Sequence, residues 1–435
     1  MTNNARLVKL CFPTVWFPLT QCGLPECRSG YLVCRYVFFG ITHMAEPIKI
    51  TIVIRSLERG GTETHLLRTL PIVASNDFLM SIFCFERPGE LSEEMRRCGI
   101  KVVTPPISGW FTHVPLMLKP FTTMWTCVFF FLHLFRRSPD VVHFFLPASY
   151  LMLAPISLLH VRSKKIMSRR SMNKYLEKYP KWVRKVEFFL HKKMSVVLAN
   201  SRAVLKQLEY MENVPAEKLR LVYNGIDETE NVSRRDFAVR ADLGIKLDAV
   251  VLATVANLLP YKGYQDLIEA CGFLSKSFPT LPDWHLIVIG NDSVGMKKEL
   301  ENLAVRLGVS QRLHFVGKRT DVNHYLAAVD IGVLVSHEEG FSNAVIEEMS
   351  AGLPMIVSDV GGNPEAVVHG ETGLVVPAKA PKELAKAIAY LLQNPSVAKE
   401  MGLAGKKRVR ECFSIEQSAE GYRSVYRSLG HSKMM

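Results

Sequence analysis

The stretch SHEEGFSNAVIEEMSAGLPMIVSDVGGNPEAVVHGETGLVVP, residues 336–377, decides the fold of this chain. Just before it, the apolar residues 331–335 are long enough for one buried strand, which the polar, glycine-containing loop 336–340 ends. Apolar residues then recur at helical spacing over residues 343–351, and residues 355–357 begin a second strand. The order of strand, loop, helix and strand indicates a parallel α/β sheet.

The start of this helix has the chemistry of a nucleotide site. The unpaired N–H groups of Ser342, Asn343 and Ala344 point back toward the loop, where they and the helix dipole favour an anion such as phosphate. Glu339 lies in the loop, and Glu347 follows eight positions later on the helix. Ionised carboxylates only accept hydrogen bonds, so we expect these two to bind sugar and ribose hydroxyls.

Five groups of residues have the order and spacing seen in a known family. They are Glu339-Gly340-Phe341, Glu347, Ala351-Gly352-Leu353-Pro354, Gly361-Gly362-Asn363-Pro364-Glu365 and Gly373-Leu374-Val375-Val376-Pro377. They resemble the signature of retaining family-4 glycosyltransferases of the GT-B fold, and the resemblance extends over about residues 48–426. The alternative is an unrelated Rossmann-like domain in which Glu347 and Glu348 are solvated helix residues.

The chain length fits two domains of roughly 200 residues each. Strands alternate with helices throughout, which predicts two Rossmann-like α/β domains with ligands at the carboxyl ends of their strands; the resemblance implies that they face each other across a cleft. We expect an extension outside the fold at residues 1–43, an acceptor-side domain at 44–228 and a nucleotide-sugar-binding domain at 241–410. The resemblance places a final helix, within 411–435, back against the first domain.

The cysteines predict neither disulfides nor a metal site. All nine are scattered without a Cys-x-x-Cys pair, and the five after residue 44 are expected to be reduced core residues. Cys11, Cys22, Cys27 and Cys34 lie in the proline-broken first 43 residues and lack zinc-site spacing. A cleaved secretory signal also fits this segment poorly.

A basic stretch lies between residues 160 and 195 of this chain of net charge +13. Twelve cations oppose Glu177 and Glu187 there: Arg162, Lys164, Lys165, Arg169, Arg170, Lys174, Lys178, Lys181, Arg184, Lys185, Lys192 and Lys193. An anionic membrane surface or a diphosphate-bearing acceptor could use these charges, and so could nucleic acid. No nucleic-acid-binding motif accompanies them, so nucleic acid is disfavoured. A solvated face with no partner is the remaining alternative.

Two uncharged runs precede the basic stretch. Residues 141–161 are long enough to span a bilayer, but Pro147 and Pro155 interrupt them, so we favour a buried strand and helix. Residues 120–135 form an apolar helix that could dock at a membrane interface beside the basic stretch.

The strand expected at residues 48–54 ends near Gly60-Gly61, where glycines let the backbone approach a phosphate closely. The resemblance implies that this turn faces the donor diphosphate. A later strand ends at His143, and many family members have a second histidine where Phe145 stands. No catalytic histidine is therefore assigned; His143 is expected to be a hydrogen-bonded core residue, with a place on the acceptor side as the alternative.

Lys262 follows the strand expected at residues 250–255 and is well placed to neutralise a departing diphosphate. The family usually has arginine where Asn257 stands. Either Asn257 donates neutral hydrogen bonds to the diphosphate, or another basic residue compensates for the missing arginine charge. The candidate bases are Arg169, Arg170 and Lys318.

The resemblance thus implies a glycosyltransferase with Lys262 and Glu339 as catalytic residues. The donor-binding residues that it implies are Gly60, Gly61, Asn257, Lys262, Lys318, Arg319, Glu339, Gly340, Phe341, Ser342, Asn343, Ala344 and Glu347. Because no Asp-x-Asp pair is present, we predict neither a metal nor another cofactor.

We expect a donor linked to UDP or GDP and an acceptor that is a glycan or a polyprenyl-diphosphate-linked glycan. The expected setting is surface polysaccharide or lipopolysaccharide biosynthesis on the cytoplasmic membrane face. The sequence does not determine which nucleotide, sugar or linkage is used, nor the oligomeric state. The alternatives are a catalytically degenerate sugar-nucleotide-binding subunit and a GT-B nucleotide-sugar epimerase.

Overall fold

The computed structural model describes residues 46–106, 119–227 and 237–430. The expected extension at 1–43, with its four cysteines, lies outside the described residues. So do most of residues 229–240, which separate the two expected domains.

Seven of the described strands form one parallel sheet in the order β3-β2-β1-β4-β5-β6-β7. The strands are β1 (Ile48–Ile54), β2 (Phe78–Cys84), β3 (Lys101–Val103), β4 (Val141–Phe145), β5 (Lys164–Arg169), β6 (Val196–Ala199) and β7 (Leu219–Leu221). The helices between them are α1 (Gly61–Val73), α2 (Ser92–Arg97), α3 (Lys119–Arg137), α4 (Pro147–Ser157), α5 (Lys181–Lys193) and α6 (Arg202–Tyr210).

Six further described strands form a second parallel sheet in the order β10-β9-β8-β11-β12-β13. They are β8 (Val250–Val255), β9 (Trp284–Ile289), β10 (Leu313–Gly317), β11 (Ile331–Leu334), β12 (Met355–Ser358) and β13 (Gly373–Val376). The helices here are α7 (Phe237–Asp242), α8 (Tyr264–Ser277), α9 (Lys297–Leu307), α10 (Val322–Ala327), α11 (Asn343–Ser350), α12 (Asn363–Ala366), α13 (Pro381–Gln393) and α14 (Pro395–Cys412). The predicted fold class, two parallel α/β sheets, is confirmed.

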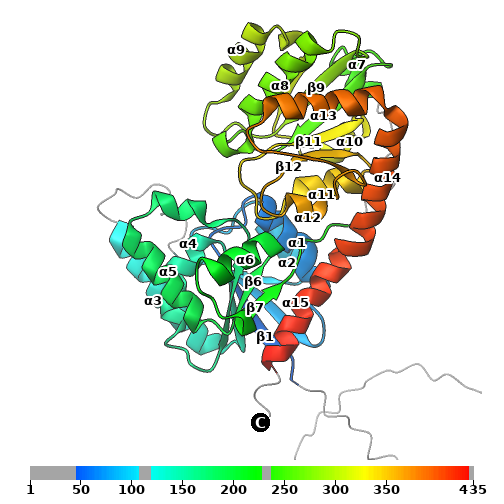
Figure 1. Ribbon diagram of the computed structural model, residues 1–435. Coiled ribbons are helices and arrows are strands. Elements are labelled where there is room, and N and C mark those ends of the chain that lie inside the picture. Colours follow the sequence, from blue (N-terminus) through cyan, green and yellow to red (C-terminus); the bar gives the residue numbers. More distant parts are fainter. Residues whose placement is uncertain (1–45, 107–118, 228–236, 431–435) are drawn as a thin grey trace, which may run out of the picture. The chain divides into compact units, whose positions relative to one another are not determined.

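The last helix, α15 (Ile415–Gly430), packs on the first sheet's side of the molecule (Figure 1). It lies against α1 and touches β1 and β4. Its buried face, which includes Ala419, Tyr422 and Tyr426, belongs to the core cluster under β1 and β2. The chain therefore returns to the first sheet after completing the second.

Strand β5 is not predicted by the sequence, because its six residues, KKIMSR, begin and end with cations. Lys165 is buried, and its Nζ donates to the main-chain carbonyls of His160 and Ser163 at 2.8 and 2.7 Å. Arg169 at the end of β5 is buried too. The twelve cations of the basic stretch therefore do not share one surface.

The uncharged run 141–161 forms the buried strand β4 and helix α4, which confirms the core interpretation. Pro147 is tolerated because it stands in the first turn of α4, where no intrahelical donor is needed. In the described part of the chain, no helix is both long and apolar enough to cross a membrane.

Candidate functional site

Three chambers share walls and so form a row at the carboxyl ends of the two sheets. Chamber 1, of 480 Å³, is lined by Arg68, Asn257, Lys318, Arg319 and Glu347 among others. Chamber 2, of 260 Å³, shares Gly61, Asn257, Asn343 and Ala344 with it and adds Arg170, Lys262 and Glu339. Chamber 3, of 570 Å³, shares Arg170, Tyr261 and Glu339 with chamber 2 and extends along the 3-10 segment η3 (Asn173–Lys178).

We call the described residues up to 227 the first half of the chain and those from 237 onward the second half. Both halves line each chamber. A further cavity, of 360 Å³, lies at the amino ends of β8 and β11 instead. Parallel α/β sheets bind ligands at the carboxyl ends of their strands. The row of three chambers is therefore the candidate site.

The N-terminus of α11 forms one wall of chamber 2. Its cap is Ser342, whose side chain accepts a hydrogen bond from the N–H of Val345. Asn224 Nδ2, from the first half, donates to the Phe341 carbonyl at 3.1 Å and to Asn343 Oδ1 at 2.7 Å. Asn343 Nδ2 donates in turn to the Gly61 carbonyl at 2.9 Å. These bonds bring the two predicted phosphate-binding backbones to one place.

Gly340 is required by how closely two main chains approach each other. A Cβ at this position would lie 2.3 Å from the main-chain oxygen of Arg170. No side chain fits in that space, so the loop before α11 can pass beside the end of β5 only with glycine here.

Lys262 and Glu339, the two predicted catalytic residues, form an ion pair. Lys262 Nζ lies 2.5 Å from Glu339 Oε1, and both side chains are largely buried. Ser336 Oγ donates to the same carboxylate oxygen at 2.7 Å. Lys262 ends the 3-10 turn Pro260–Lys262, and Gly263 follows with a φ of +71°, which favours glycine. The pair places a cation and a hydrogen-bond acceptor together in chamber 2.

Glu347 also has a cationic partner in this structure. Arg68 Nη1, on α1, lies 2.6 Å from Glu347 Oε1 in chamber 1. Sequence analysis does not identify Arg68, because it lies 279 positions before Glu347 in an otherwise ordinary helical pattern. The only signal is its place on the helix that follows the Gly60-Gly61 turn.

The remaining donor-side candidates line chamber 1. Asn257 Oδ1 accepts a hydrogen bond from the N–H of Asn291 at 3.3 Å. Arg319 pairs with Asp321 and lies over the ring of Tyr325 at 4.7 Å. Lys318 lines the same chamber.

Arg169 and Arg170 point to opposite sides of the sheet, as successive residues at a strand end do. Arg170 lines chambers 2 and 3 and donates to the hydroxyl of Tyr422 at 3.3 Å. Burial lowers the pKa of its guanidinium, which nevertheless stays protonated because the pKa of arginine begins above 12. Arg170 is therefore the one of the two that can act as the compensating base.

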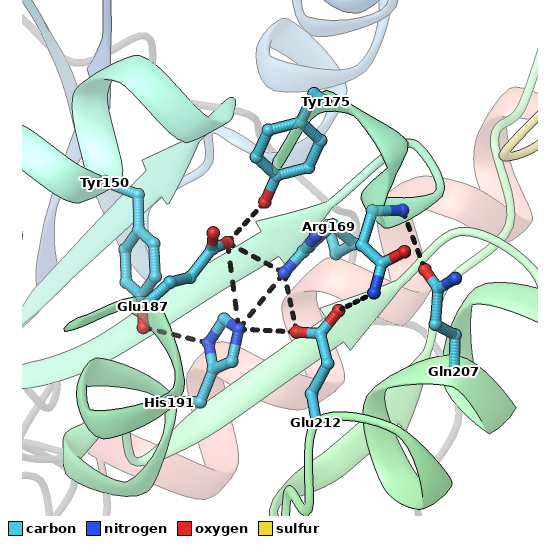
Figure 2. A network of polar contacts seen from close by, with 8 residues as sticks. Tyr150, Arg169, Tyr175, Glu187, His191, Gln207 and Glu212 are labelled. Carbon is cyan, nitrogen blue, oxygen red and sulfur yellow. Dashed lines mark hydrogen bonds and ion pairs between the residues drawn. The ribbon is translucent and has the colours of Figure 1, made fainter. Parts of the chain in front are cut away.

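Arg169, one of the three candidate bases, lines none of the three chambers. Its side chain is 1% exposed, and its Nη2 lies 2.8 Å from both Glu187 and Glu212 (Figure 2). Because those two buried carboxylates hold its charge, Arg169 cannot also bind a ligand in the chambers.

The acceptor-side placement of His143 is also wrong. The residue is fully buried in β4, where its Nδ1 bonds to the Tyr426 hydroxyl at 2.8 Å and its Nε2 to Ser168 Oγ at 2.7 Å. Burial, assisted by the charge of Arg170, holds its pKa well below the usual value. His143 is a neutral core residue that stabilises the contact with α15.

Glu365 makes a further contact between the halves that its motif does not reveal. Its carboxylate accepts from the N–H groups of Arg202 and Ala203, each at 2.8 Å, and from the Tyr223 hydroxyl at 2.8 Å. A second-half carboxylate thus satisfies the N-terminus of α6.

Across residues 46–106, 119–227 and 237–430, no three His, Cys, Asp or Glu side chains gather as a metal site would require.

Two family models match this chain. The model described as Glycosyl transferases group 1 matches residues 236–408, and that described as Glycosyltransferase Family 4 matches residues 59–230. The N-acetyl-alpha-D-glucosaminyl L-malate synthase of Bacillus anthracis is 27% identical over 231 residues, which cover 53% of this chain and 59% of that protein. The D-inositol 3-phosphate glycosyltransferase of Corynebacterium efficiens is 31% identical over 238 residues, covering 53% and 56%. The match thus spans a little over half the length of each relative.

Solved structures of the same fold cover most of this chain. HepE of Anabaena in complex with UDP-glucose superimposes with a TM-score of 0.73 at 21% identity, covering 88% of this chain and 100% of that one. WaaG, a glycosyltransferase involved in lipopolysaccharide biosynthesis, gives a TM-score of 0.66 at 16% identity, covering 87% and 99%. At these identities the likeness shows the fold alone.

Proposed function

We infer the function of this chain from its family: it belongs to the group 1, family 4 glycosyltransferases and has their two-domain GT-B fold. We propose that it is a retaining enzyme that moves a sugar from a UDP- or GDP-linked donor to an acceptor hydroxyl. One observation carries this proposal: a helix N-terminus and two cations, Lys262 and Arg170, surround the middle one of three connected chambers.

The three chambers match the three parts of such a reaction. In chamber 1, Glu347 binds the ribose hydroxyls, and the loop at Lys318 and Arg319 contacts the base. In chamber 2, the diphosphate lies on the N–H groups of residues 341–344, beside the Gly60-Gly61 turn. Glu339, on the wall shared by chambers 2 and 3, binds the donor sugar, and the acceptor enters through chamber 3.

The chemical role of chamber 2 is to stabilise the departing diphosphate. As the bond from the anomeric carbon to the diphosphate oxygen breaks, negative charge grows on that oxygen. Lys262, Arg170 and the α11 N-terminus are already held around the place where it develops. Removing one such donor from other enzymes costs about 3–4 kcal/mol of transition-state stabilisation.

We propose that this enzyme needs no metal, because Lys262, Arg170 and the helix N-terminus neutralise the diphosphate. The initial rate with the preferred donor is expected to stay within about twofold in excess EDTA. A rate that EDTA abolishes and magnesium restores would contradict this.

We propose a lipid-linked glycan as acceptor, in surface polysaccharide or lipopolysaccharide biosynthesis, with the protein bound peripherally to the cytoplasmic membrane face. The support is an exposed apolar stripe on α3: Phe121, Met124, Trp125, Val128, Leu132 and Phe135. These residues recur at helical spacing, while the opposite face of α3 packs into the core. WaaG, a solved structure of the same fold, is named for lipopolysaccharide biosynthesis.

Helix α5 adds charge to this surface. Both α3 and α5 pack against α4, and α5 exposes Trp182 and Phe189 together with five cations: Lys181, Arg184, Lys185, Lys192 and Lys193. Helix α3 has no acidic residue, and the one on α5, Glu187, is buried. Apolar side chains bordered by unopposed cations suit anionic lipid headgroups. Segment η3 of chamber 3 directly precedes α5, so a lipid-linked acceptor would enter from this side.

The function is tested with a panel of UDP- and GDP-sugars, measuring thermal shift and release of the nucleoside diphosphate. One donor is expected to stabilise the protein and to be slowly hydrolysed, and Glu347→Ala is expected to lose both effects. Glu400→Ala, an exposed change on α14, is the matched control and should retain both. Binding without turnover, even with acceptor present, would favour the degenerate subunit. The transferase proposal fails if no donor binds.

A further inference from the structure

Both carboxylates assigned to donor hydroxyls are occupied by cations in this structure. Glu339 pairs with Lys262, and Glu347 pairs with Arg68. A carboxylate held by a cation has fewer lone pairs left for a hydroxyl, so each cation competes with the arriving donor sugar or ribose. Lys262 then has the diphosphate as its new partner. Arg68, once released from Glu347, also lacks an anionic partner.

Arg68 is placed to take the diphosphate as that partner. It stands two turns along α1 from Gly61, and its side chain is 34% exposed while that of Glu347 is 25% exposed, so neither is locked in the core. Arg68 lines chamber 1, which shares the walls at Gly61, Asn343 and Ala344 with chamber 2. The diphosphate is proposed to bind at that shared wall.

The other cations of the row are placed differently. Arg170 and Lys262 line chamber 2, away from the nucleoside end. Arg319 already pairs with Asp321. Asn257, on the wall shared by chambers 1 and 2, contributes no charge. Lys318, also in chamber 1, lies on the loop assigned to the base. Arg68 is the chamber 1 cation that pairs with Glu347, the carboxylate assigned to the ribose.

We propose that Arg68 is a donor-binding cation supplied by the first half: it holds Glu347 in the empty site and moves to the diphosphate when ribose takes its place. This assignment rests on the proposed function. Guanidinium suits the role because its planar fork pairs with either a carboxylate or a phosphate. Ribose binding and diphosphate binding are thereby coupled, because each arriving group takes one partner of the same ion pair.

The exchange predicts opposite effects on two ligands. In Arg68→Met, Glu347 is open to ribose without competition, so the nucleoside, uridine or guanosine, should bind up to about fivefold more tightly. The same variant lacks a charged donor for the diphosphate, so UDP or GDP should bind at least about tenfold more weakly. Arg68→Lys, which keeps the charge without the fork, should recover part of the diphosphate affinity.

The experiment titrates wild type, Arg68→Met and Arg68→Lys with UDP, GDP, uridine and guanosine, using calorimetry for the nucleotides and ligand-observed NMR for the weaker nucleosides. Arg55→Met is the matched control: Arg55 forms an ion pair of 2.7 Å with Glu86 and lines none of the three chambers. It should bind all four ligands as wild type does. Thermal unfolding checks that each variant is folded.

Opposite shifts in Arg68→Met support the exchange. Unchanged diphosphate affinity overturns it, and so does an equal weakening for nucleoside and nucleotide, which would mean that Arg68 only supports the shape of the site. If wild type binds neither UDP nor GDP, the proposed function itself fails, a result distinct from the other two.

Discussion

Two adjacent glutamates on α11 show how strongly the environment of a side chain differs between neighbouring positions of a helix. Glu347 points into chamber 1, whereas the side chain of Glu348 is completely buried, and neither of its oxygens has a hydrogen-bond partner in the structure. Burial, and secondarily the charge of Glu347, raises the pKa of Glu348 well above its usual value. Burial without a hydrogen-bond partner therefore favours the protonated, uncharged form of Glu348. Both are solvated helix residues in the alternative interpretation, which the structure excludes.

This raised pKa makes Glu348 a cost to stability that grows with pH. Below the pKa of the unfolded chain, about 4.3, both states are protonated and nothing is lost. Above it the unfolded state ionises first, so the free energy of unfolding falls by up to about 1.4 kcal/mol per pH unit until the folded pKa is reached. Glu348→Gln should remove this loss, so its stability relative to wild type should increase from pH 5 to pH 8 in urea unfolding. A difference that is constant with pH would show that Glu348 is ionised in the fold.

The sequence predicts the site residues that lie within one motif and misses those that reach it from elsewhere. Glu339, Glu347 and Lys262 stand at strand-to-helix loops, whose positions follow from periodicity and resemblance. Arg68 and Asn224 enter the same site from the first half, and nothing in their local sequence marks them.

At the scale of elements, β5 and α5 are joined by a buried charged network. Arg169 lies between Glu187 and Glu212, and His191 bonds to Glu212 and to the Tyr150 hydroxyl (Figure 2). Burial alone would raise the pKa of Glu212, but the His191 hydrogen bond and the Arg169 charge outweigh it and lower that pKa. The network helps to explain why β5 escapes prediction: Arg169 at its end looks solvated, yet its partners lie 18 and 43 positions further on.

Arg169→Met should therefore be severely destabilising. The change leaves two carboxylates buried without their cation, so the free energy of unfolding should fall by about 3–5 kcal/mol. Lys185→Met, an exposed change on α5, should stay within about 0.5 kcal/mol of wild type in the same urea titration. A loss below 1 kcal/mol for Arg169→Met would mean that the network is hydrated in solution.

The proposal that this protein binds a membrane rests on helices α3 and α5. Wild type should sediment with vesicles that contain phosphatidylglycerol, and less with phosphatidylcholine alone or at high salt. Phe121→Ser and Trp125→Ser should each weaken binding by about tenfold, because each removes an apolar side chain that would enter the interface. Leu403→Ser removes an equally exposed apolar residue from α14 and should change nothing. Wild type that stays in the supernatant would contradict the proposal.

At the scale of the whole molecule, the sequence predicts the two sheets because alternating strands and helices leave few topologies for each. It does not predict which side chains join the halves. Asn224, Asn343 and Glu365 make those contacts through hydrogen bonds between residues 117 to 282 positions apart. Such bonds leave no periodic pattern, so only the structure reveals them.

The central claim is that chamber 2 binds the diphosphate of a nucleotide donor, and calorimetric titration with UDP and GDP tests it most directly. Wild type should bind one of the two, and Lys262→Met should bind it at least about tenfold more weakly, because a charged hydrogen bond to the diphosphate is lost. Lys298→Met, an exposed change on α9, should bind as wild type does. Wild type that binds neither nucleotide, or Lys262→Met that binds as tightly as wild type, would contradict the claim.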